Sequence, residues 1–388
     1  MLAVWVMGMG REKAAALGPE AIEEIISAKP GRIMYVRNLV KYFFLRRGII
    51  EFLTGKPPRS VKAVDGVSFD VKPKEIFGLA GESGCGKTTT GKVITRLYDP
   101  TAGTILYKPS KEILAALEDI SGGRVRVHDG YVDIASIPRK WFKPLRREIQ
   151  MIFQDPYGAL NPRMRVGDIL EEPLLVHGIG SPEERKEAIL KALEDVRLVP
   201  PEEFIGRYPH MLSGGQRQRV AIARALILGA KFVVADEPVS MIDVSLRAEL
   251  LKLMMSLRDR FGLTYLFITH DLAVARYLCD RIAIMYLGKI VEIGDADDVI
   301  DNPLHPYTEA LISAIPEPDP SNRARLRKVP IKGEVPSAVF VPSGCRFHPR
   351  CVVLDEHPEL REKCCKEEPP LVEVKPERYV ACWYVMKK

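Results

Sequence analysis

The sequence predicts an α/β fold, and three observations lead to this prediction. From Ile33 to about residue 300, strand-like runs alternate with helix-like runs, which is the pattern of α/β domains. A glycine-rich stretch, GESGCGKTTT, joins the strand candidate EIFGLA to the helix candidate TTTGKVITRLY, the order that a phosphate-binding loop requires. A third run, KFVVADE, is an apolar strand candidate that ends in Asp236 and Glu237.

Length and composition exclude several classes of protein. The chain has 388 residues, of which 46% are hydrophobic, enough for about two to three domains with full cores. No run approaches the roughly 18 uncharged apolar residues of a membrane helix. The apolar start, MLAVWVMGM, lacks the flanks of a signal peptide, so we expect a cytoplasmic protein. A net charge of +6 suits phosphate ligands or an anionic membrane, but also an ordinary solvated surface.

The strongest local signal is the phosphate-loop pattern G-x-x-x-x-G-K-[ST], which Gly81, Gly86, Lys87 and Thr88 fit. Glycines let successive backbone N–H groups curl around phosphates, and the following helix N-terminus adds partial positive charge. We expect Lys87 to neutralise the β- and γ-phosphate oxygens and Thr88 to bind Mg²⁺. The nucleotide-binding residues predicted in this loop are Gly81, Ser83, Gly84, Cys85, Gly86, Lys87, Thr88 and Thr89.

Three other strand candidates end in polar residues that suit a nucleotide site. At the end of a parallel strand, Asp236 can hold Mg²⁺ and Glu237 can orient or deprotonate the attacking water. The same two acids also fit the start of a turn before Pro238. YLFITHD places His270 where it contacts a γ-phosphate or simply ends a strand, and IQMIFQDP places Gln154 where it senses Mg²⁺ or water.

Helix starts are the next signal along the chain. In MLSGGQRQRVAIARAL a second anion-binding helix start is predicted, although Ser213 is also an ordinary N-cap residue. In SPEERKEAILKALEDV, Ser181 and Pro182 begin an amphipathic helix. A further helix, SLRAELLKLMMSLRDRFG, stops at Gly262. Residues 104–145 have no clean period and are interpreted as a surface insertion without an assigned role.

Taken in order, these segments resemble the ATP-binding subunit of an ABC transporter, which has a P-loop NTPase fold with a helical subdomain. The resemblance implies a head-to-tail dimer of cassettes, with ATP held between one Walker A loop and the other LSGGQ signature. It also implies an aromatic residue stacked on adenine, for which LVKYFF offers Phe43 and its neighbour Tyr42. The motifs that it implies are Walker A at 81–89, the Gln loop at Gln154, the signature at Leu212, Ser213, Gly214, Gly215 and Gln216, and Walker B at Asp236. It also implies the catalytic base Glu237, the switch His270, and a D-loop at Ser240, Met241, Ile242 and Asp243, where Ala-Leu-Asp is commoner. The implied Mg²⁺ ligands are Thr88, Gln154 and Asp236.

The resemblance narrows to the oligopeptide/dipeptide importer branch through FQDPYGALNPRMRVGDIL, NPLHPYTEALISAIP and IKGEVPSAVFVPSGCRFHPRC. It implies ATP hydrolysis that energises import of oligopeptides, dipeptides or oligosaccharides from the cytoplasmic face of the cell membrane. Implied partners are a homologous second ATPase subunit, two membrane permeases and an extracytoplasmic solute-binding protein, with no nucleic acid. The implied domains are an N-terminal extension at 1–32, an ATPase domain at 33–300 with a helical subdomain at about 155–230, and a C-terminal extension at 301–388.

The alternative is a soluble ABC-type ATPase of DNA repair or chromosome maintenance. Such heads separate Walker A from the signature by long heptad arms. Here about 125 residues lie between Lys87 and Ser213 without a sustained heptad pattern. The spacing therefore disfavours this alternative.

Five of the seven cysteines lie in the last 44 residues, which are rich in proline. Structural disulfides are rare in a reducing cytoplasm, so we expect a metal site there, with free thiols as the alternative. Cys345, Cys351, Cys364 or Cys365, and Cys382 provide four thiolates for zinc or an iron–sulfur cluster. The five residues between Cys345 and Cys351 exceed the usual zinc spacing and favour the cluster. The family resemblance implies a [4Fe–4S] centre and selects Cys364 over Cys365.

Overall fold

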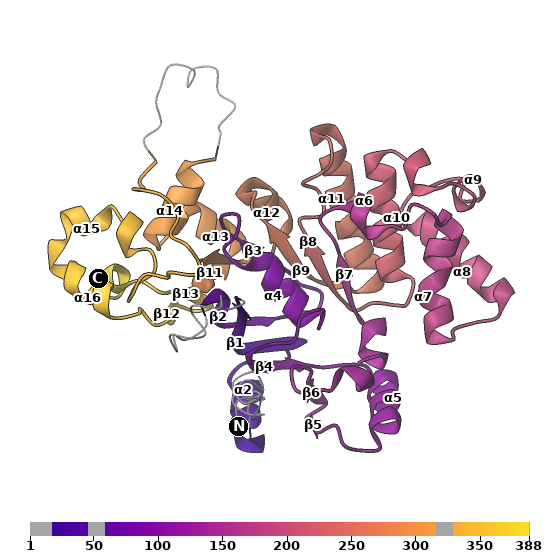
Figure 1. The fold of residues 1–388 in the computed structure, drawn as a ribbon, viewed down its shortest axis with the longest axis horizontal. Helices are drawn as coiled ribbons and strands as arrows, with labels where there is room; N and C mark the ends of the chain where they lie inside the picture. Colours follow the sequence, from indigo (N-terminus) through magenta and orange to yellow (C-terminus); the bar gives the residue numbers. More distant parts are fainter. Residues whose placement is uncertain (1–17, 46–58, 316–328, 388) are drawn as a thin grey trace, which may run out of the picture.

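The structure is a computed structural model that describes residues 18–45, 59–315 and 329–387 (Figure 1). The apolar start of the chain, for which no signal peptide is expected, lies outside the described residues. Two sheets occupy the middle of the molecule, a group of helices lies on one side, and the C-terminal extension lies on the other. In the described part of the chain, no helix combines the length and the apolar character needed to cross a membrane.

An eight-stranded sheet forms the centre of the molecule. Strands β10, β3, β9, β8 and β7 run parallel, and β11, β13 and β12 continue the sheet in antiparallel fashion. Every residue of β3, β8 and β9 is buried, as expected for parallel strands covered on both faces. The strands, in sheet order, are β12 (Val372–Lys375), β13 (Arg378–Val380), β11 (Lys289–Asp295), β10 (Arg281–Tyr286), β3 (Ile76–Ala80), β9 (Thr264–Thr269), β8 (Phe232–Asp236) and β7 (Ile149–Ile152).

A second sheet, antiparallel and five-stranded, packs against the first. The rings of Phe69 in β2 and Phe77 in β3 stack across the two sheets, with centroids 5.1 Å apart. Apolar residues of both sheets form one continuous core there. The strands, in sheet order, are β2 (Ser60–Val71), β1 (Met34–Phe44), β4 (Ala102–Tyr107), β6 (Tyr131–Asp133) and β5 (Val127–His128).

Helices predicted from the sequence form where expected. Helix α8 begins after Ser181, whose hydroxyl accepts the Glu184 N–H at 3.3 Å, and α11 ends at Gly262 with a φ of 65°. Helices α6 to α11 form the group on one side of the main sheet (Figure 1). The helices are α2 (Pro19–Ala28), α4 (Lys87–Ile94), α5 (Lys111–Ser121), α6 (Pro156–Ala159), α7 (Val166–His177), α8 (Pro182–Asp195), α9 (Glu202–Ile205), α10 (Gly214–Leu226), α11 (Val244–Phe261), α12 (Leu272–Leu278), α13 (Ala296–Asp301), α14 (Pro306–Ser313), α15 (Val353–Glu356), α16 (Arg361–Lys366) and α17 (Trp383–Lys387).

Residues 104–145, interpreted as an excursion without a period, are ordered and partly internal. Strands β4 and β6 belong to the antiparallel sheet, and Tyr107 and Val132 are fully buried. Helix α5 is capped by Ser110 and buries Ile113 and Leu117. Ile113, Leu114, Leu117 and Ile120 recur at helical spacing, so the interpretation of this segment as lacking a period was wrong.

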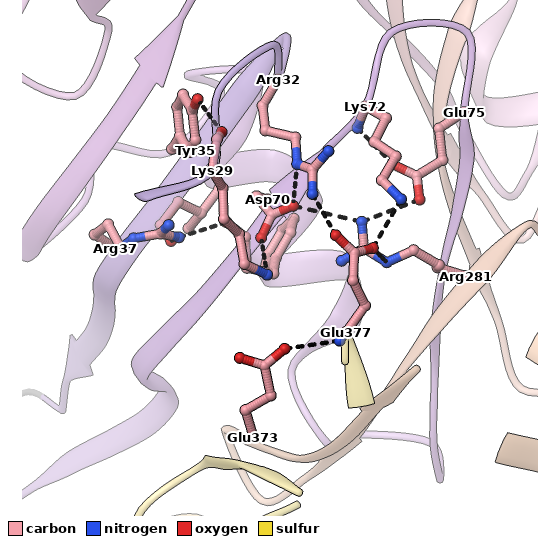
Figure 2. Close-up of polar contacts among 12 residues, drawn as sticks. Lys29, Arg32, Tyr35, Arg37, Asp70, Lys72, Glu75, Arg281, Glu373 and Glu377 are labelled. Carbon is pink, nitrogen blue, oxygen red and sulfur yellow. Dashed lines mark hydrogen bonds and ion pairs between the residues drawn. The ribbon is translucent and has the colours of Figure 1, made fainter. Parts of the chain in front are cut away.

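Ion pairs fasten the C-terminal extension and helix α2 to the sheets (Figure 2). Asp70 in β2 is 4% exposed and pairs with Lys29 at 3.2 Å, Arg32 at 2.7 Å and Arg281 at 3.4 Å. Arg32 also reaches Glu377, beside β13, at 2.5 Å. A shared set of charges therefore joins residues just after α2 to the end of the extension.

Candidate nucleotide site

The phosphate loop lies between β3 and α4, at the carboxyl end of the central strands. Gly81, Gly84 and Gly86 have φ values of 148°, 79° and 113°, which favour glycine over other residues. A Cβ at Gly81 would meet the carbonyl oxygen of Met285, and one at Gly86 that of Ala63. The loop can therefore approach its surroundings this closely only because both positions are glycine.

Other loop residues differ in their access to solvent. Ser83 and Gly84 are exposed, whereas Thr88 and Thr89 are half-buried. Cys85 is buried, and burial raises the pKa of its thiol above the ordinary value. The exposed backbone at Ser83 and Gly84 is therefore the part of the loop that is open to a ligand.

Lys87 and Thr88 start helix α4 and point toward the loop and the neighbouring strand. Lys87 is 4% exposed, and its ammonium donates to the carbonyl oxygens of Gly81 at 2.7 Å and Glu82 at 2.9 Å. The Thr88 hydroxyl donates to Asp236 Oδ1 at 2.8 Å. The buried Lys87 cation is thus next in the chain to the Thr88 hydroxyl, which is paired with the Asp236 carboxylate.

Asp236 ends strand β8, as predicted, and is 2% exposed. Burial raises the pKa of its carboxyl above the ordinary value, which is the direction expected when a charged group loses water. A hydroxyl and a carboxylate are hard oxygen donors of the kind that Mg²⁺ prefers. The chemistry of Thr88 and Asp236 therefore fits a magnesium ion.

Glu237 lies next to Asp236 and faces two of the predicted site residues. Its Oε2 accepts a hydrogen bond from Gln154 Nε2 at 3.1 Å and lies 2.9 Å from His270 Nδ1. The Ser240 hydroxyl donates to the Glu237 carbonyl oxygen at 2.9 Å. The structure thus brings Glu237, Gln154 and His270 together, and it places the Gln154 amide on Glu237 rather than on Asp236.

The LSGGQ residues begin helix α10, within the helical group rather than beside α4 (Figure 1). Ser213 Oγ accepts from Gln216 N at 3.3 Å, and Gln216 Oε1 accepts from Ser213 N at 3.0 Å. Ser213 is exposed, and Gly214, Gly215 and Gln216 are half-buried. The signature is therefore a capped helix start that solvent reaches, located away from the phosphate loop of its own chain.

The two candidate aromatic residues on β1 have different partners. The Tyr42 hydroxyl donates to Asp65 Oδ1 at 2.5 Å, and burial, followed by this hydrogen bond, raises the pKa of Tyr42. Phe43 meets Tyr98 with ring centroids 5.5 Å apart. Since Tyr98 is 37% exposed, Phe43 and Tyr98 offer an aromatic surface, of which the sequence indicated only Phe43.

The four candidate metal ligands of the extension, all of them described residues, lie near one another but do not form a metal site. Cys345 N donates to the carbonyl oxygen of Cys364 at 2.8 Å. Burial, and then the nearby thiols of Cys382, Cys364 and Cys351, raise the pKa of Cys345 to about 12. All seven cysteines are free, and within residues 18–45, 59–315 and 329–387 no group of three or more His, Cys, Asp or Glu side chains is arranged to hold a metal ion. The cysteine site is thus not preformed and stays a prediction.

Sequence comparisons place this site in a known family. The ABC transporter family matches residues 64–240, and the family described as "Oligopeptide/dipeptide transporter, C-terminal region" matches residues 291–357. The oligopeptide transport ATP-binding protein AppF of Bacillus subtilis is 42% identical over 357 residues, covering 92% of this chain and 98% of that protein. The chain belongs to the ATP-binding subunits of oligopeptide/dipeptide ABC transporters. As an ABC ATPase subunit, it is also similar to the dipeptide transport ATP-binding protein DppF of Haemophilus influenzae, 42% identical over 90% of this chain and 95% of that protein.

Solved structures share the cassette. The dimeric ATP-binding cassette MJ0796 in a post-hydrolysis state, bound to ADP and Pi, has a TM-score of 0.53 and 27% identity, covering 68% of this chain and 98% of that one. The cbiO1 protein of Clostridium perfringens, at 23% identity and a TM-score of 0.54, shares the fold. These matches confirm the predicted ABC-type ATPase, and they do not favour the DNA-repair alternative.

The sequence did not reveal that the extension contacts the phosphate loop. The Arg350 guanidinium pairs with the Glu82 carboxylate at 2.9 Å, and the Tyr307 hydroxyl accepts the Glu82 N–H at 2.9 Å. Glu82 occupies one of the variable positions of the phosphate-loop pattern. No local signal could have found these contacts, because their partners come from segments more than two hundred residues away in the chain.

Proposed function

We propose that this ATPase subunit is bound at the cytoplasmic face of a cell membrane and energises the import of oligopeptides or dipeptides. The observation that carries the proposal is the match of both the cassette and the C-terminal region to peptide transporters, together with 42% identity to AppF over 357 residues. The partners that we propose are a homologous second ATPase subunit, two membrane permeases and an extracytoplasmic solute-binding protein. ATP is the substrate.

In the proposed reaction, the loop N–H groups and Lys87 hold the phosphates of ATP. Mg²⁺, when bound, supplies the positive charge that shields the phosphate oxygens, and Thr88 and Asp236 are the residues that would hold it, with Gln154 as a further candidate. Glu237 Oε2 is engaged with Gln154 and His270, so we assign its Oε1 to accept the proton of the attacking water. We assign the contact with the γ-phosphate to His270, whose side chain is 56% exposed.

We further propose that the second nucleotide-binding surface of each site comes from the partner cassette. The exposed signature at Ser213 would meet ATP held by the other subunit, and Phe43 would stack on adenine. In support, the start of α10 lies apart from α4 of the same chain (Figure 1).

We propose that a short cytoplasmic helix of a permease docks on the stretch from Gln154 to Val176 and on the helices near 182–198. A cavity of about 390 Å³ there is lined by Phe153, Pro173, Val176 and neighbouring residues, and Val176 is 58% exposed. The lining also includes the charged side chains of Arg146, Glu172 and Arg224, and a groove of mixed character can accept a short amphipathic helix. We expect a cysteine introduced at Arg163 to crosslink to a permease in the assembled transporter, and crosslinks to no permease would contradict this docking place.

Reconstitution tests the proposed cargo. The chain is co-purified with its permeases and second ATPase subunit, placed in lipid vesicles, and supplied with ATP and the solute-binding protein. We expect ATP-dependent uptake of radiolabelled dipeptides or oligopeptides. Uptake of oligosaccharides and not of peptides would change the assigned cargo. Uptake that continues without ATP would refute the role in energising transport.

We propose, in addition, that Cys345, Cys351, Cys364 and Cys382 bind a structural [4Fe–4S] cluster. An all-thiolate donor set suits iron–sulfur clusters or zinc. Cys364 is buried and belongs to a small apolar cluster in which Cys345 and Cys351 also pack. Its pKa is raised to about 11 by burial and then by Cys382 and Cys351, which supports a shared site.

A matched pair of variants tests the cluster. Anaerobically purified chain is expected to be brown and to contain about four irons. Cys364→Ser should lose the iron, whereas Cys365→Ser, its chain neighbour, should keep it. Stoichiometric zinc without iron would replace the cluster by a zinc site, and the absence of both metals would leave four free thiols.

A further inference from the structure

The segment Cys345–Cys351, CRFHPRC, sits against the phosphate loop. Arg350 Nη1 lies 2.9 Å from Glu82 Oε2, and both Nη1 and Nη2 lie 3.2 Å from Oε1. Two guanidinium nitrogens thus engage both oxygens of one carboxylate, the geometry in which arginine binds carboxylates most strongly. The Arg350 side chain is 7% exposed and that of Glu82 is 25% exposed, so the pair is only partly screened by water.

The surroundings of Arg350 fix its position. Its main chain belongs to a single helical turn, in which Arg350 N donates to Phe347 O at 2.9 Å. Phe347 is 1% exposed and packs on Tyr286 and Tyr307, with ring centroids 5.4 Å away in each case. Because Phe347 is anchored in this aromatic core, the backbone that carries Arg350 is held beside the phosphate loop.

The same segment reaches strand β2, whose Asp65 accepts a hydrogen bond from Tyr42 on β1, the strand that carries the proposed adenine contact. Arg346 donates to the carbonyl oxygen of Leu287 and pairs with Asp65. Although burial alone would raise it, the pKa of Asp65 is held below its ordinary value by hydrogen bonds from Tyr42 and Arg346. One seven-residue segment of the extension therefore contacts the phosphate loop through Arg350 and strand β2 through Arg346.

Charge gives the Arg350 contact a consequence for ATP. Glu82 follows Gly81 inside the loop that binds the phosphates, and its carboxylate carries the same sign of charge as the ligand. An uncompensated carboxylate there would repel a triphosphate. It would also compete with the phosphates for the Lys87 ammonium, which donates to the Glu82 carbonyl oxygen. Arg350 neutralises the carboxylate and holds it in one orientation, while Tyr307 holds the Glu82 N–H.

We propose that Arg350 of the C-terminal extension is a positioning residue for ATP, which acts by neutralising and orienting Glu82 of the phosphate loop. The extension is thereby a part of the nucleotide site and not only an appendage of the cassette. The proposal depends on ATP binding at this loop and is independent of the cargo.

Direct binding measurements on the purified full chain test the proposal. Calorimetry gives the Kd for MgATP of the unaltered chain and of Arg350→Ala. We expect Arg350→Ala to raise this Kd about tenfold, the effect of losing a charge-assisted hydrogen-bonded pair. In phosphate-release assays the KM for ATP should rise by a similar factor, while kcat at saturating ATP changes much less. Arg361→Ala, which removes an arginine of the same extension that is 62% exposed, should leave the Kd unchanged.

The double variant Arg350→Ala with Glu82→Gln separates positioning from simple support of the fold. If Arg350 acts by neutralising Glu82, removing the Glu82 charge should bring the Kd back to within about twofold of the unaltered chain. An unchanged Kd in Arg350→Ala, or a double variant as weak as Arg350→Ala, would overturn the proposal. If Arg350→Ala does not fold, Arg350→Lys takes its place, because it keeps a positive charge but loses the two-pronged guanidinium contact. Arg350→Lys should raise the Kd for MgATP by less than tenfold, and adding Glu82→Gln should restore the Kd. Unaltered binding in Arg350→Lys together with no response to Glu82→Gln would equally refute it.

Discussion

Glu237 has a backbone conformation that is rare for its residue type. Its φ is 46°, in the left-handed region where residues other than glycine are strained. Two contacts hold it there: Glu237 N donates to Ile268 O at 3.0 Å, and Ser240 Oγ donates to Glu237 O at 2.9 Å. The strained backbone aims the carboxylate at Gln154 and His270, so orientation of this acid is built into the turn that follows β8.

Replacing the Glu237 carboxylate tests its role as the base. Glu237→Gln keeps the shape and the Gln154 contact region but removes the proton acceptor, so ATP turnover should fall about 10² or more. Phosphate release in the assembled transporter measures the effect, and ATP-bound dimers should accumulate on size exclusion. Glu118→Gln, an exposed acid on α5, serves as the control. Near-normal turnover of Glu237→Gln would remove Glu237 from this role.

At the residue scale, the sequence predicts what is encoded locally. Lys87 and Thr88 follow from one glycine pattern, and Asp236 follows from an apolar strand that ends in an acid. The preference of Gln154 for Glu237 and the pairing of Arg350 with Glu82 could not be predicted, because each depends on how distant elements dock. Side chains that support a site from outside its motifs carry no spacing rule.

At the scale of elements, strand β13 couples the extension to the main sheet through a buried charge. Arg378 Nη2 lies 2.6 Å from Glu292 Oε1 in β11, and the two side chains are 3% and 0% exposed. Burial raises the pKa of Glu292, although Thr308 and Arg378 oppose the shift. The addition of β13 and β12 to the sheet was not predicted: β12 alternates apolar and polar residues, but each strand is only three or four residues long and prolines surround them.

Removing one partner of this buried pair should destabilise the fold. Arg378→Met leaves the Glu292 carboxylate buried without its counter-ion, and the free energy of unfolding should fall by about 3–5 kcal/mol. Urea unfolding followed by circular dichroism measures the change. Lys366→Ala breaks an exposed pair with Glu362, 71% and 79% exposed, and should cost no more than about 1 kcal/mol. Equal decreases in the free energy of unfolding of the two variants would contradict the claim that burial makes the Arg378–Glu292 pair more important.

At the scale of the whole molecule, the proposed dimer can be tested with two serines that cap helices in the same way. Ser213 and Ser181 each form a capping box with the residue three positions on, so replacing either by alanine should cost about 1 kcal/mol of stability. Only Ser213→Ala should reduce turnover, about tenfold or more, because only Ser213 would meet the ATP of a partner. ATPase assays and unfolding curves measure both effects. Equal turnover in the two variants would leave Ser213 as a helix cap alone.

The overall architecture was predictable because its signals are strong and repeated. Apolar strands separated by helices predicted the central sheet, and Ser181 and Gly262 marked helix ends correctly. Helix α2 was missed, although Ile22 and Ile26 pack on Tyr35 and Leu106 of the antiparallel sheet. Ile22, Ile25 and Ile26 recur at helical spacing and Pro19 stands in the first turn, so the sequence does contain a signal for this helix.

The separation of Glu82 and Arg350 along the chain has a consequence during protein synthesis. Their sequence positions differ by 268 residues, and ribosomes add roughly 5–20 residues per second, so the phosphate loop exists for about 13–54 s before its arginine is made. Throughout that interval Glu82 lacks the positive charge that we assign to it. We therefore expect a nascent cassette to bind cellular ATP with a higher Kd than the finished protein. The full affinity for ATP is reached only after the extension has been translated.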